Sequence, residues 1–214
     1  MGIVRVSSSV SLDGFSAGPD VSTDAPMGVG GERLHRWLFG GGADRDVAAD
    51  GTTPGGDDAA VSAELFARTG AVVVGRRTYD IGVDLWGDTP FPVPTFVVTH
   101  RAQETRPMTS ASFTFVTDGV ASAVAQAVTV AGDRDVLVMG GAEVVRQALA
   151  AGVVDEIVLN VVPVLLHRGS RLLDVAGARH TALETTELER TGLVATAEAT
   201  HLTFRVVRRP ATRG

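Results

Sequence analysis

Two apolar runs that stop at glycine and pass directly into a helical pattern are the clearest feature of the chain. One is VVVGRRTYD, residues 72–80, and the other is DVLVMGGAEVVRQAL, residues 135–149. A short valine-rich run indicates a buried strand, and apolar residues at spacings of three and four indicate a helix. Each stretch therefore predicts a strand that ends at glycine and is followed at once by a helix.

The same patterns recur along the chain and predict an alternation of strands and helices. We expect strands over residues 3–10, 71–74, 95–99, 112–117, 136–139 and 156–162. We expect helices from residue 76 onward and over residues 32–39, 57–67, 120–131 and 142–150. Residues 182–190 and 193–207, around Thr191 and Gly192, predict an antiparallel hairpin. This order implies an α/β protein with a mostly parallel sheet between two layers of helices, which the hairpin makes mixed.

The chain predicts one domain. Its 214 residues suit a single core, and no boundary divides them. Residues 40–58, GGGADRDVAADGTTPGGDD, are rich in glycine and aspartate, which is typical of an irregular, flexible loop. We therefore expect a single domain over residues 1–214 with a loop insertion at residues 40–58.

Composition and charge limit the cellular location and the binding partners that we expect. No apolar run approaches the roughly 20 residues that cross a bilayer, and the first residues lack the apolar core of a signal peptide. A net charge of −6 argues against binding to nucleic acid or to an anionic membrane, since both favour a basic surface. We expect a cytoplasmic protein whose partner is a small-molecule substrate, with no nucleic acid and no membrane.

The chain contains no cysteine and no lysine. The first absence excludes disulfides, thiolate nucleophiles and cysteine-bound zinc or iron–sulfur clusters. The second excludes Schiff-base chemistry and the lysine of a phosphate-binding P-loop. Because no paired carboxylates, Ser-His-Asp set or metal-ligand spacing emerges, we expect no metal site.

The two glycine-ended strands predict a site for phosphate. A helix N-terminus carries unpaired N–H groups and a partial positive charge. Arg76, Arg77 and Thr78 stand on the opening turn of one helix, and Gly140 with Gly141 would let a pyrophosphate approach the other closely. Two such seats suggest a ligand with a diphosphate, and NADPH is the leading candidate. The alternatives are a solvated helix start for the arginines and an ordinary tight turn for the glycines.

Other polar residues follow predicted strands or stand near them. Thr99, His100 and Arg101 end a strand, where open α/β sheets bind ligands, and could hold the ribose 2′-phosphate of NADPH or form an ordinary polar strand end. Asp13 in SLDGF could touch the substrate or the nicotinamide, although Asp-Gly is also common in turns. Glu32 on the short helix could relay a proton or simply lie in solvent.

The order of these pieces resembles the dihydrofolate reductase-like family. A first strand runs into SLDGF, and then come VVVGRRTY, a strand that ends THR, VMGGA, and a strand through NVVPVLL. Within that family the sequence is most similar to the riboflavin-biosynthesis reductase domain, which is the C-terminal domain of RibD, and to its uncharacterised bacterial relatives. The resemblance spans nearly the whole chain.

The resemblance implies a three-layer α/β fold with a mostly parallel mixed sheet of about eight strands and a C-terminal antiparallel hairpin. It also implies a homodimer and an NADPH site across the C-terminal edge of the sheet. The end of the first strand would face the nicotinamide, the glycine turns would face the phosphates, and the THR strand end would surround the adenosine phosphate. The cofactor-binding residues that it implies are Val10, Ser11, Leu12, Gly75, Arg76, Arg77, Thr78, Thr99, His100, Arg101, Met139, Gly140, Gly141, Ala142, Glu143 and Val144.

The chain departs from the family in two places. The riboflavin enzymes often carry a zinc deaminase half, whose cysteines this chain lacks. Dihydrofolate reductases place a carboxylate on the first helix; here Trp37 matches the helix aromatic residue, so Leu34 falls near the carboxylate position and Glu32 is the nearest substitute.

We therefore predict an NADPH-dependent reductase that transfers a hydride to a C=N or C=O bond of a small heterocyclic substrate. Asp13 or Glu32 would order the water that supplies the proton. Two alternatives stay open: a nucleotide-binding module of the same fold without turnover, and a reductase that uses a flavin or a deazaflavin.

Overall fold

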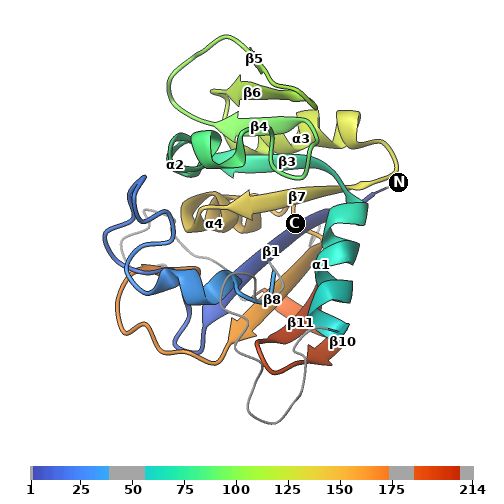
Figure 1. Ribbon diagram of the computed structural model, residues 1–214. Helices are drawn as coiled ribbons and strands as arrows, with labels where there is room; N and C mark the ends of the chain where they lie inside the picture. Colours follow the sequence, from blue (N-terminus) through green and yellow to red (C-terminus); the bar gives the residue numbers. More distant parts are fainter. Residues whose placement is uncertain (1, 39–55, 174–185, 208–214) are drawn as a thin grey trace, which may run out of the picture.

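A nine-stranded sheet forms the centre of the computed structural model, which describes residues 2–38, 56–173 and 186–207 (Figure 1). The strand order across this sheet is β10-β11-β8-β1-β7-β3-β4-β6-β5. Its strands are β1 (Val4–Ser11), β3 (Thr69–Gly75), β4 (Thr95–Val98), β5 (Arg106–Pro107), β6 (Ser112–Val116), β7 (Asp135–Gly140), β8 (Glu156–Val162), β10 (Glu187–Ala195) and β11 (Thr200–Val207). Two short strands, β2 (Phe15–Ala17) and β9 (Ser170–Arg171), pair separately.

The predicted mixed, mostly parallel sheet is confirmed. The neighbouring strands β8, β1, β7, β3, β4 and β6 run parallel, and their C-terminal ends meet at one edge. Strands β5 and β11 are antiparallel to their neighbours in this group. The sheet has nine strands rather than about eight because it includes β5, whose two residues are too few to leave a hydrophobic pattern.

The helices cover both faces of the sheet (Figure 1). Helices α1 (Gly56–Arg68) and α2 (Arg76–Trp86) pack on one face, and α3 (Val120–Ala131) and α4 (Ala142–Ala150) pack on the other. Strand β3 is buried throughout because alternate side chains enter the two cores, Val72 on the α2 side and Val73 on the α3 side. None of the helices in the described parts of the chain is long and apolar enough to cross a bilayer.

The predicted turn of the C-terminal hairpin is wrong. The chain reverses at residues 196–199, where the Thr196 N–H donates to the Ala199 carbonyl over 2.9 Å. Gly192 instead lies at an irregularity inside β10, where an ideal Cβ would come 3.1 Å from the side chain of Thr203. The glycine therefore relieves crowding at a β-bulge rather than forming a turn.

Two further predictions need a change of boundary. The short helix expected over residues 32–39 is a 3₁₀-helix, η1 (Gly31–His35), and Leu34 and Trp37, three residues apart, are both buried. The loop expected over residues 40–58 lies mostly outside the described residues, and its last residues, 56–58, are the first residues of α1.

A buried ion cluster ties the strands together at the edge opposite their C-terminal ends. Arg5 is 5% exposed; its Nε lies 2.8 Å from Oε1 of Glu156 and its Nη2 lies 3.4 Å from Oδ2 of Asp135. Arg68 from α1 donates from Nε to the same oxygen of Asp135 over 2.8 Å. The cluster connects β1, β7, β8 and α1, and each buried charge has an opposite charge beside it.

Candidate functional site

The N-termini of α2 and α4 lie side by side at the C-terminal edge of the sheet. Strands β3 and β7, which lead into them, are parallel neighbours, with Val74 opposite Gly140. An ideal Cβ on Gly75 would lie 2.9 Å from Cγ2 of Val144 in α4. An ideal Cβ on Gly141 would lie 3.3 Å from Oγ1 of Thr78 in α2. The structure therefore places the two helix N-termini that were predicted to bind phosphate next to each other.

Both helix tips present backbone rather than side chains. Gly75 and Gly141 are the N-cap residues, and neither cap makes a side-chain hydrogen bond. Apart from Gly141 and its two chain neighbours, the Thr78 hydroxyl is the one described group within 4 Å of the Cβ position of Gly141. Gly140 joins Gly141 through a cis peptide bond and has a φ of 129°, which favours glycine. An anion at this edge could reach N–H groups of both helices.

The two arginines that follow Gly75 bind protein groups. Arg76 donates from Nε to Oδ1 of Asp80 over 2.8 Å and from Nη1 to Oε1 of Gln103 over 2.9 Å. Arg77 donates from Nη2 to the carbonyl of Val21 over 3.1 Å. The Arg76 side chain therefore begins at the N-terminus of α2 and extends toward the connection between β4 and β5.

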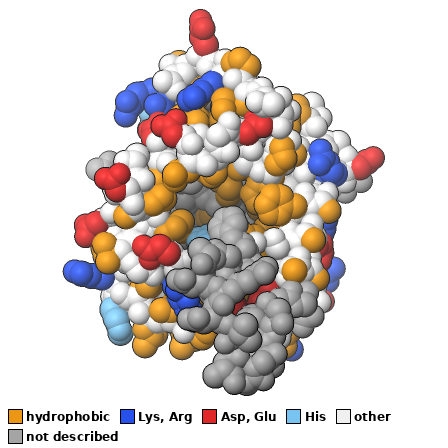
Figure 2. Space-filling model, viewed as in Figure 1, with side chains coloured by type: hydrophobic (Ala, Val, Ile, Leu, Met, Phe, Trp, Pro, Cys, Tyr) orange, Lys and Arg blue, Asp and Glu red, His pale blue; other side chains and the backbone are white. Residues whose placement is uncertain are grey.

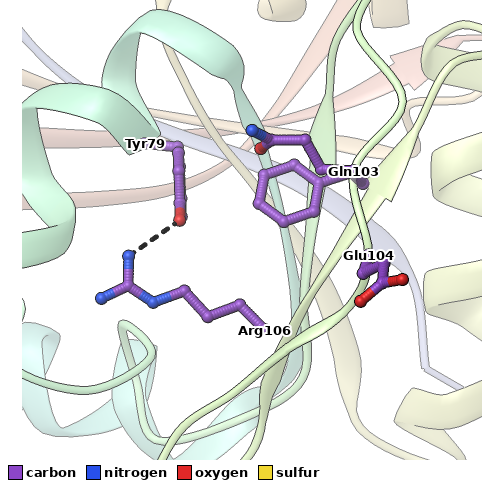
Figure 3. Close-up of a pocket in the computed structure, with 5 residues that line it drawn as sticks. Tyr79, Gln103, Glu104 and Arg106 are labelled. Atoms are coloured by element: carbon purple, nitrogen blue, oxygen red, sulfur yellow. Dashed lines mark hydrogen bonds between the residues drawn. The ribbon is translucent and has the colours of Figure 1, made fainter.

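A pocket of about 410 Å³ lies between α2, the connection after β4 and the strands β5 and β6 (Figure 3). Arg106 donates from Nη1 to the hydroxyl of Tyr79 over 3.1 Å. The guanidinium carbon of Arg76 lies 5.7 Å from the ring centre of Tyr79, a cation–π distance. No sequence motif marks this pocket, because separate segments supply its lining residues, Tyr79, Gln103, Glu104, Arg106 and Phe115.

The end of β4 carries the other predicted phosphate ligands. Thr99 is buried; its N–H donates to the carbonyl of Val116 over 3.0 Å, and its hydroxyl accepts from the N–H of Arg101 over 3.1 Å. These bonds fix the strand end beside β6. The side chains of His100 and Arg101 are exposed there.

The residues predicted to face the nicotinamide lie at the end of β1. Val10 and Ser11 are buried, whereas Leu12 is 69% exposed and donates its N–H to the carbonyl of Val164 over 2.9 Å. The Ser11 hydroxyl donates to Oδ1 of Asp13 over 2.6 Å. Leu12 is thus the one residue of the three with an exposed side chain.

Asp13 joins the loop after β1 to the loop after β8. Its Oδ1 accepts from the N–H of Leu166 over 3.1 Å, and its Oδ2 accepts from the N–H of His167 over 2.7 Å. Hydrogen bonds from the Ser11 hydroxyl and then from these N–H groups lower the pKa of Asp13 to about 2. The carboxylate is therefore charged at neutral pH with both oxygens bonded, which favours the turn interpretation over proton transfer.

The other predicted proton relay lies on η1. Glu32 is exposed in its first turn, and Leu34, which the resemblance places near the carboxylate position of the dihydrofolate reductases, is fully buried. His35 has a buried Nδ1 that makes no hydrogen bond within the described residues, and burial lowers its pKa to about 4. His35 is therefore neutral at pH 7.

A buried polar cluster lies on the face of the sheet that carries η1 and α1. This face is hollowed near its centre, and hydrophobic side chains gather around the hollow (Figure 2). His201, Asn160 and Asp58 are each less than 5% exposed and bond to one another. No sequence motif marks His201, because its partners come from β8 and α1, which are distant in the chain.

The arrangement suits an anionic ligand with more than one phosphate. Two uncapped helix N-termini, the Thr78 hydroxyl and the nearby Arg76 and Arg101 offer N–H and O–H donors along one edge. The described residues contain no group of three or more histidine or acidic side chains that could hold a metal ion.

Known structures share this fold. A putative riboflavin biosynthesis protein from Shewanella sp. PV-4 is 18% identical, with a TM-score of 0.66 over 96% of this chain and 99% of that chain. A pyrimidine reductase-like protein from Corynebacterium diphtheriae is 14% identical, with a TM-score of 0.61 over 97% and 93%. A dihydrofolate reductase from Enterococcus faecalis, complexed with NADP(H), is 12% identical, with a TM-score of 0.55 over 96% of each chain. The fold is therefore that of the dihydrofolate reductases.

Sequence comparison identifies the family. No curated protein has a significant match to the chain. The family model of the RibD C-terminal domain matches residues 3–197, which include both glycine turns and the ends of β1, β4 and β8. The chain therefore belongs to the RibD C-terminal domain family.

Proposed function

We propose that the protein is an NADPH-dependent reductase that transfers a hydride to a C=N or C=O bond of a small heterocyclic substrate. The observation that carries this proposal is the adjacency of the α2 and α4 N-termini, where the Cβ position of Gly141 lies 3.3 Å from Oγ1 of Thr78. Membership of the RibD C-terminal domain family supports it. So does the fold that the chain shares with a reductase complexed with NADP(H).

The residues present fit a dinucleotide. Apart from Gly140 and its two chain neighbours, no described residue has an atom within 4 Å of the Cβ position of Gly140, so the space beside this backbone is open. We assign the pyrophosphate to residues 140–144 and Thr78, the adenosine phosphate to His100 and Arg101, and the nicotinamide to residues 10–12. When bound, NADPH supplies the hydride, and the protein supplies orientation and shelter from water.

The protein's own residues would divide the remaining work. We propose that the N–H groups of α4 hold the pyrophosphate in register while Leu12, an exposed apolar side chain, shields the nicotinamide end from water. Asp13 would shape this end by holding the two loops together, since its carboxylate is already bonded to backbone N–H groups. Glu32, exposed on η1, is the residue that we propose orders the water for the proton.

Cofactor titration tests the proposal. Nicotinamide fluorescence should show saturable NADPH binding, weaker NADH binding and no competition from FMN or a deazaflavin. NADPH oxidation is then followed with pterins, ribitylated pyrimidines, quinones and simple carbonyls as substrates. Flavin binding without NADPH binding would replace the proposal with the flavin alternative. Tight NADPH binding without oxidation across this panel would favour a binding module.

We also propose that the protein is a homodimer. Strand β10 is an edge of the described sheet, and apart from the partly buried Gly192 all its residues are exposed, including Leu188 at 43% and Leu193 at 55%. Exposed apolar side chains on an edge strand favour association. Sedimentation equilibrium should show a dimer that Leu193→Arg dissociates, and a monomeric wild-type protein would reject this proposal.

A further inference from the structure

Three buried polar residues form one row across β1, β8 and β11. Ser9 is the register partner of Asn160, and Asn160 is the register partner of His201. Their exposed fractions are 5%, 1% and 3%. Polar side chains buried in this way cost free energy unless they are hydrogen-bonded. The row lies two residues before the ends of β1 and β8, or about 7 Å along the strands.

His201 bonds through both ring nitrogens. Its Nδ1 lies 2.7 Å from Oδ1 of Asn160, and its Nε2 lies 2.8 Å from Oδ1 of Asp58. Asp58 belongs to the first turn of α1, and the same oxygen accepts from the hydroxyl of Thr196 over 2.9 Å. The cluster therefore fastens the start of α1 to β8 and to the β10–β11 turn, in an interior where such bonds are strong.

Trp37 connects this cluster to the candidate site. Its Nε1 donates to Oγ of Ser9 over 2.9 Å, and its ring meets the His201 ring edge-on, with centres 4.7 Å apart. The indole is 3% exposed and packs with Leu34 of η1 and with Val162 at the end of β8. One side chain thus touches the row, the short helix and the strand ends beside the nicotinamide end of the proposed site.

We infer that His201 and Asp58 are positioning residues, which hold Trp37 and η1 against the end of β1 and so set the geometry at the nicotinamide end. This inference rests on the proposed function. Apolar side chains of similar volume would fill the same space without the cost of burying polar groups, so stability alone does not account for the network. Hydrogen bonds with fixed directions specify one position for the indole, as a hydride-transfer site requires.

The fluorescence of Trp37 tests this inference in the full-length protein. The chain has two tryptophans, so Trp86→Phe leaves Trp37 as the sole indole. In that background His201→Leu should increase acrylamide quenching of Trp37 and reduce the nicotinamide emission that Trp37 sensitises in bound NADPH. The Kd for NADPH should stay within about twofold of the value for Trp86→Phe, or about 0.4 kcal/mol, because His201→Leu does not alter the helix N-termini that are proposed to bind the phosphates.

Matched variants separate positioning from general loss of packing. Asp58→Asn keeps an oxygen that accepts from His201 and should retain the parent spectra, whereas Asp58→Leu should behave like His201→Leu. Thr95→Val removes a hydroxyl that is equally buried, in β4, and should change neither signal. If His201→Leu does not fold, Asp58→Leu, which removes the partner of the His201 Nε2, carries the same test.

The outcomes distinguish the inference from the proposed function. Unchanged quenching and unchanged sensitised emission in a folded His201→Leu protein that binds NADPH would overturn the positioning role and leave the proposed function intact. A parent protein that does not bind NADPH would overturn the proposed function and, with it, the positioning of a nicotinamide.

Discussion

Addition of a methyl group at residue 141 is the most specific way to perturb the proposed phosphate-binding turn. Gly141 has a φ of −64°, which alanine adopts readily, so Gly141→Ala places no strain on the backbone through this angle. Beyond the residues on either side of it in the chain, the new methyl would have one described atom within 4 Å, Oγ1 of Thr78 at 3.3 Å. We expect the free energy of unfolding to change by no more than about 0.5 kcal/mol. The melting temperature should then move by no more than about 2 °C.

The effect on NADPH should be much larger than the effect on stability. The methyl would stand where the pyrophosphate approaches the N–H groups at the start of α4. A hydrogen bond to a charged group contributes about 1.5–3 kcal/mol. Loss of one such bond raises the Kd by about 10- to 150-fold. Thr78→Ala, which removes the hydroxyl beside the methyl, separates a clash with the cofactor from a clash within the protein.

Nicotinamide fluorescence titrations of four proteins complete this test: the wild type, each single variant, and the Gly141→Ala, Thr78→Ala double variant. A clash with the cofactor predicts that the double variant binds no better than Gly141→Ala alone. Recovery in the double variant would assign the loss to the Thr78 hydroxyl instead. An unchanged Kd in folded Gly141→Ala would refute the close approach of a pyrophosphate at this turn, which is the basis of the proposed function.

Three further changes probe the specificity, the pH response and the stability of the molecule. Arg101→Ala should weaken the binding of NADPH by about 1.5–3 kcal/mol and leave the binding of NADH unchanged, whereas Arg190→Ala, at an exposed position, should change neither. Equal losses for both cofactors in titrations would contradict the 2′-phosphate assignment. Burial lowers the pKa of His35 from 6.5 to about 4. The wild type should therefore lose up to about 3 kcal/mol of stability as the pH falls from 6.5 to 4. Urea titrations at each pH should show this loss in the wild type and not in His35→Phe. Asp135→Ala removes one of the two carboxylates beside the buried Arg5 and the acceptor of the Arg68 Nε–H, so it should lower the free energy of unfolding by about 1.5–3 kcal/mol in urea denaturation. The exposed Glu64→Ala should lower it by less than about 1 kcal/mol, and similar losses for the two variants would show that the cluster is not effectively buried.

Most elements of the fold follow from local patterns. Helices α3 and α4 and strand β8 have the predicted bounds, because each combines a clear periodicity with a glycine or polar residue at its ends. Gly192 misled the hairpin prediction because a glycine at a bulge and a glycine at a turn look alike in sequence. Strand β5 has two residues and forms only because β6 offers it a partner.

The candidate site was less predictable than the fold, because its residues owe their roles to partners distant in sequence. The pattern SLDG places Asp13 in a turn, but the N–H groups that occupy its carboxylate belong to residues 166 and 167. Arg76 was expected to face a phosphate, yet Gln103, on the following connection, accepts one of its N–H groups. His201 stood alone in the sequence, and only the pairing of β11 with β8 brings it to Asn160. None of these contacts can be predicted from the spacing of residues along the sequence.

The strand order brings the two glycine turns to one crevice. From β3 the chain passes through α2 to β4 on one side, and from β7 it passes through α4 toward β8 on the other, so the order reverses between β3 and β7. The helices at such a reversal lie on opposite faces, and the crevice between their N-termini is where open α/β sheets bind ligands. Thr78 enters this crevice from one face and Gly141 from the other, and an ideal Cβ on Gly141 would lie 3.3 Å from Oγ1 of Thr78. A lone phosphate would need one of these tips, whereas two linked phosphates can engage both, and this is the physical reason to expect a dinucleotide here.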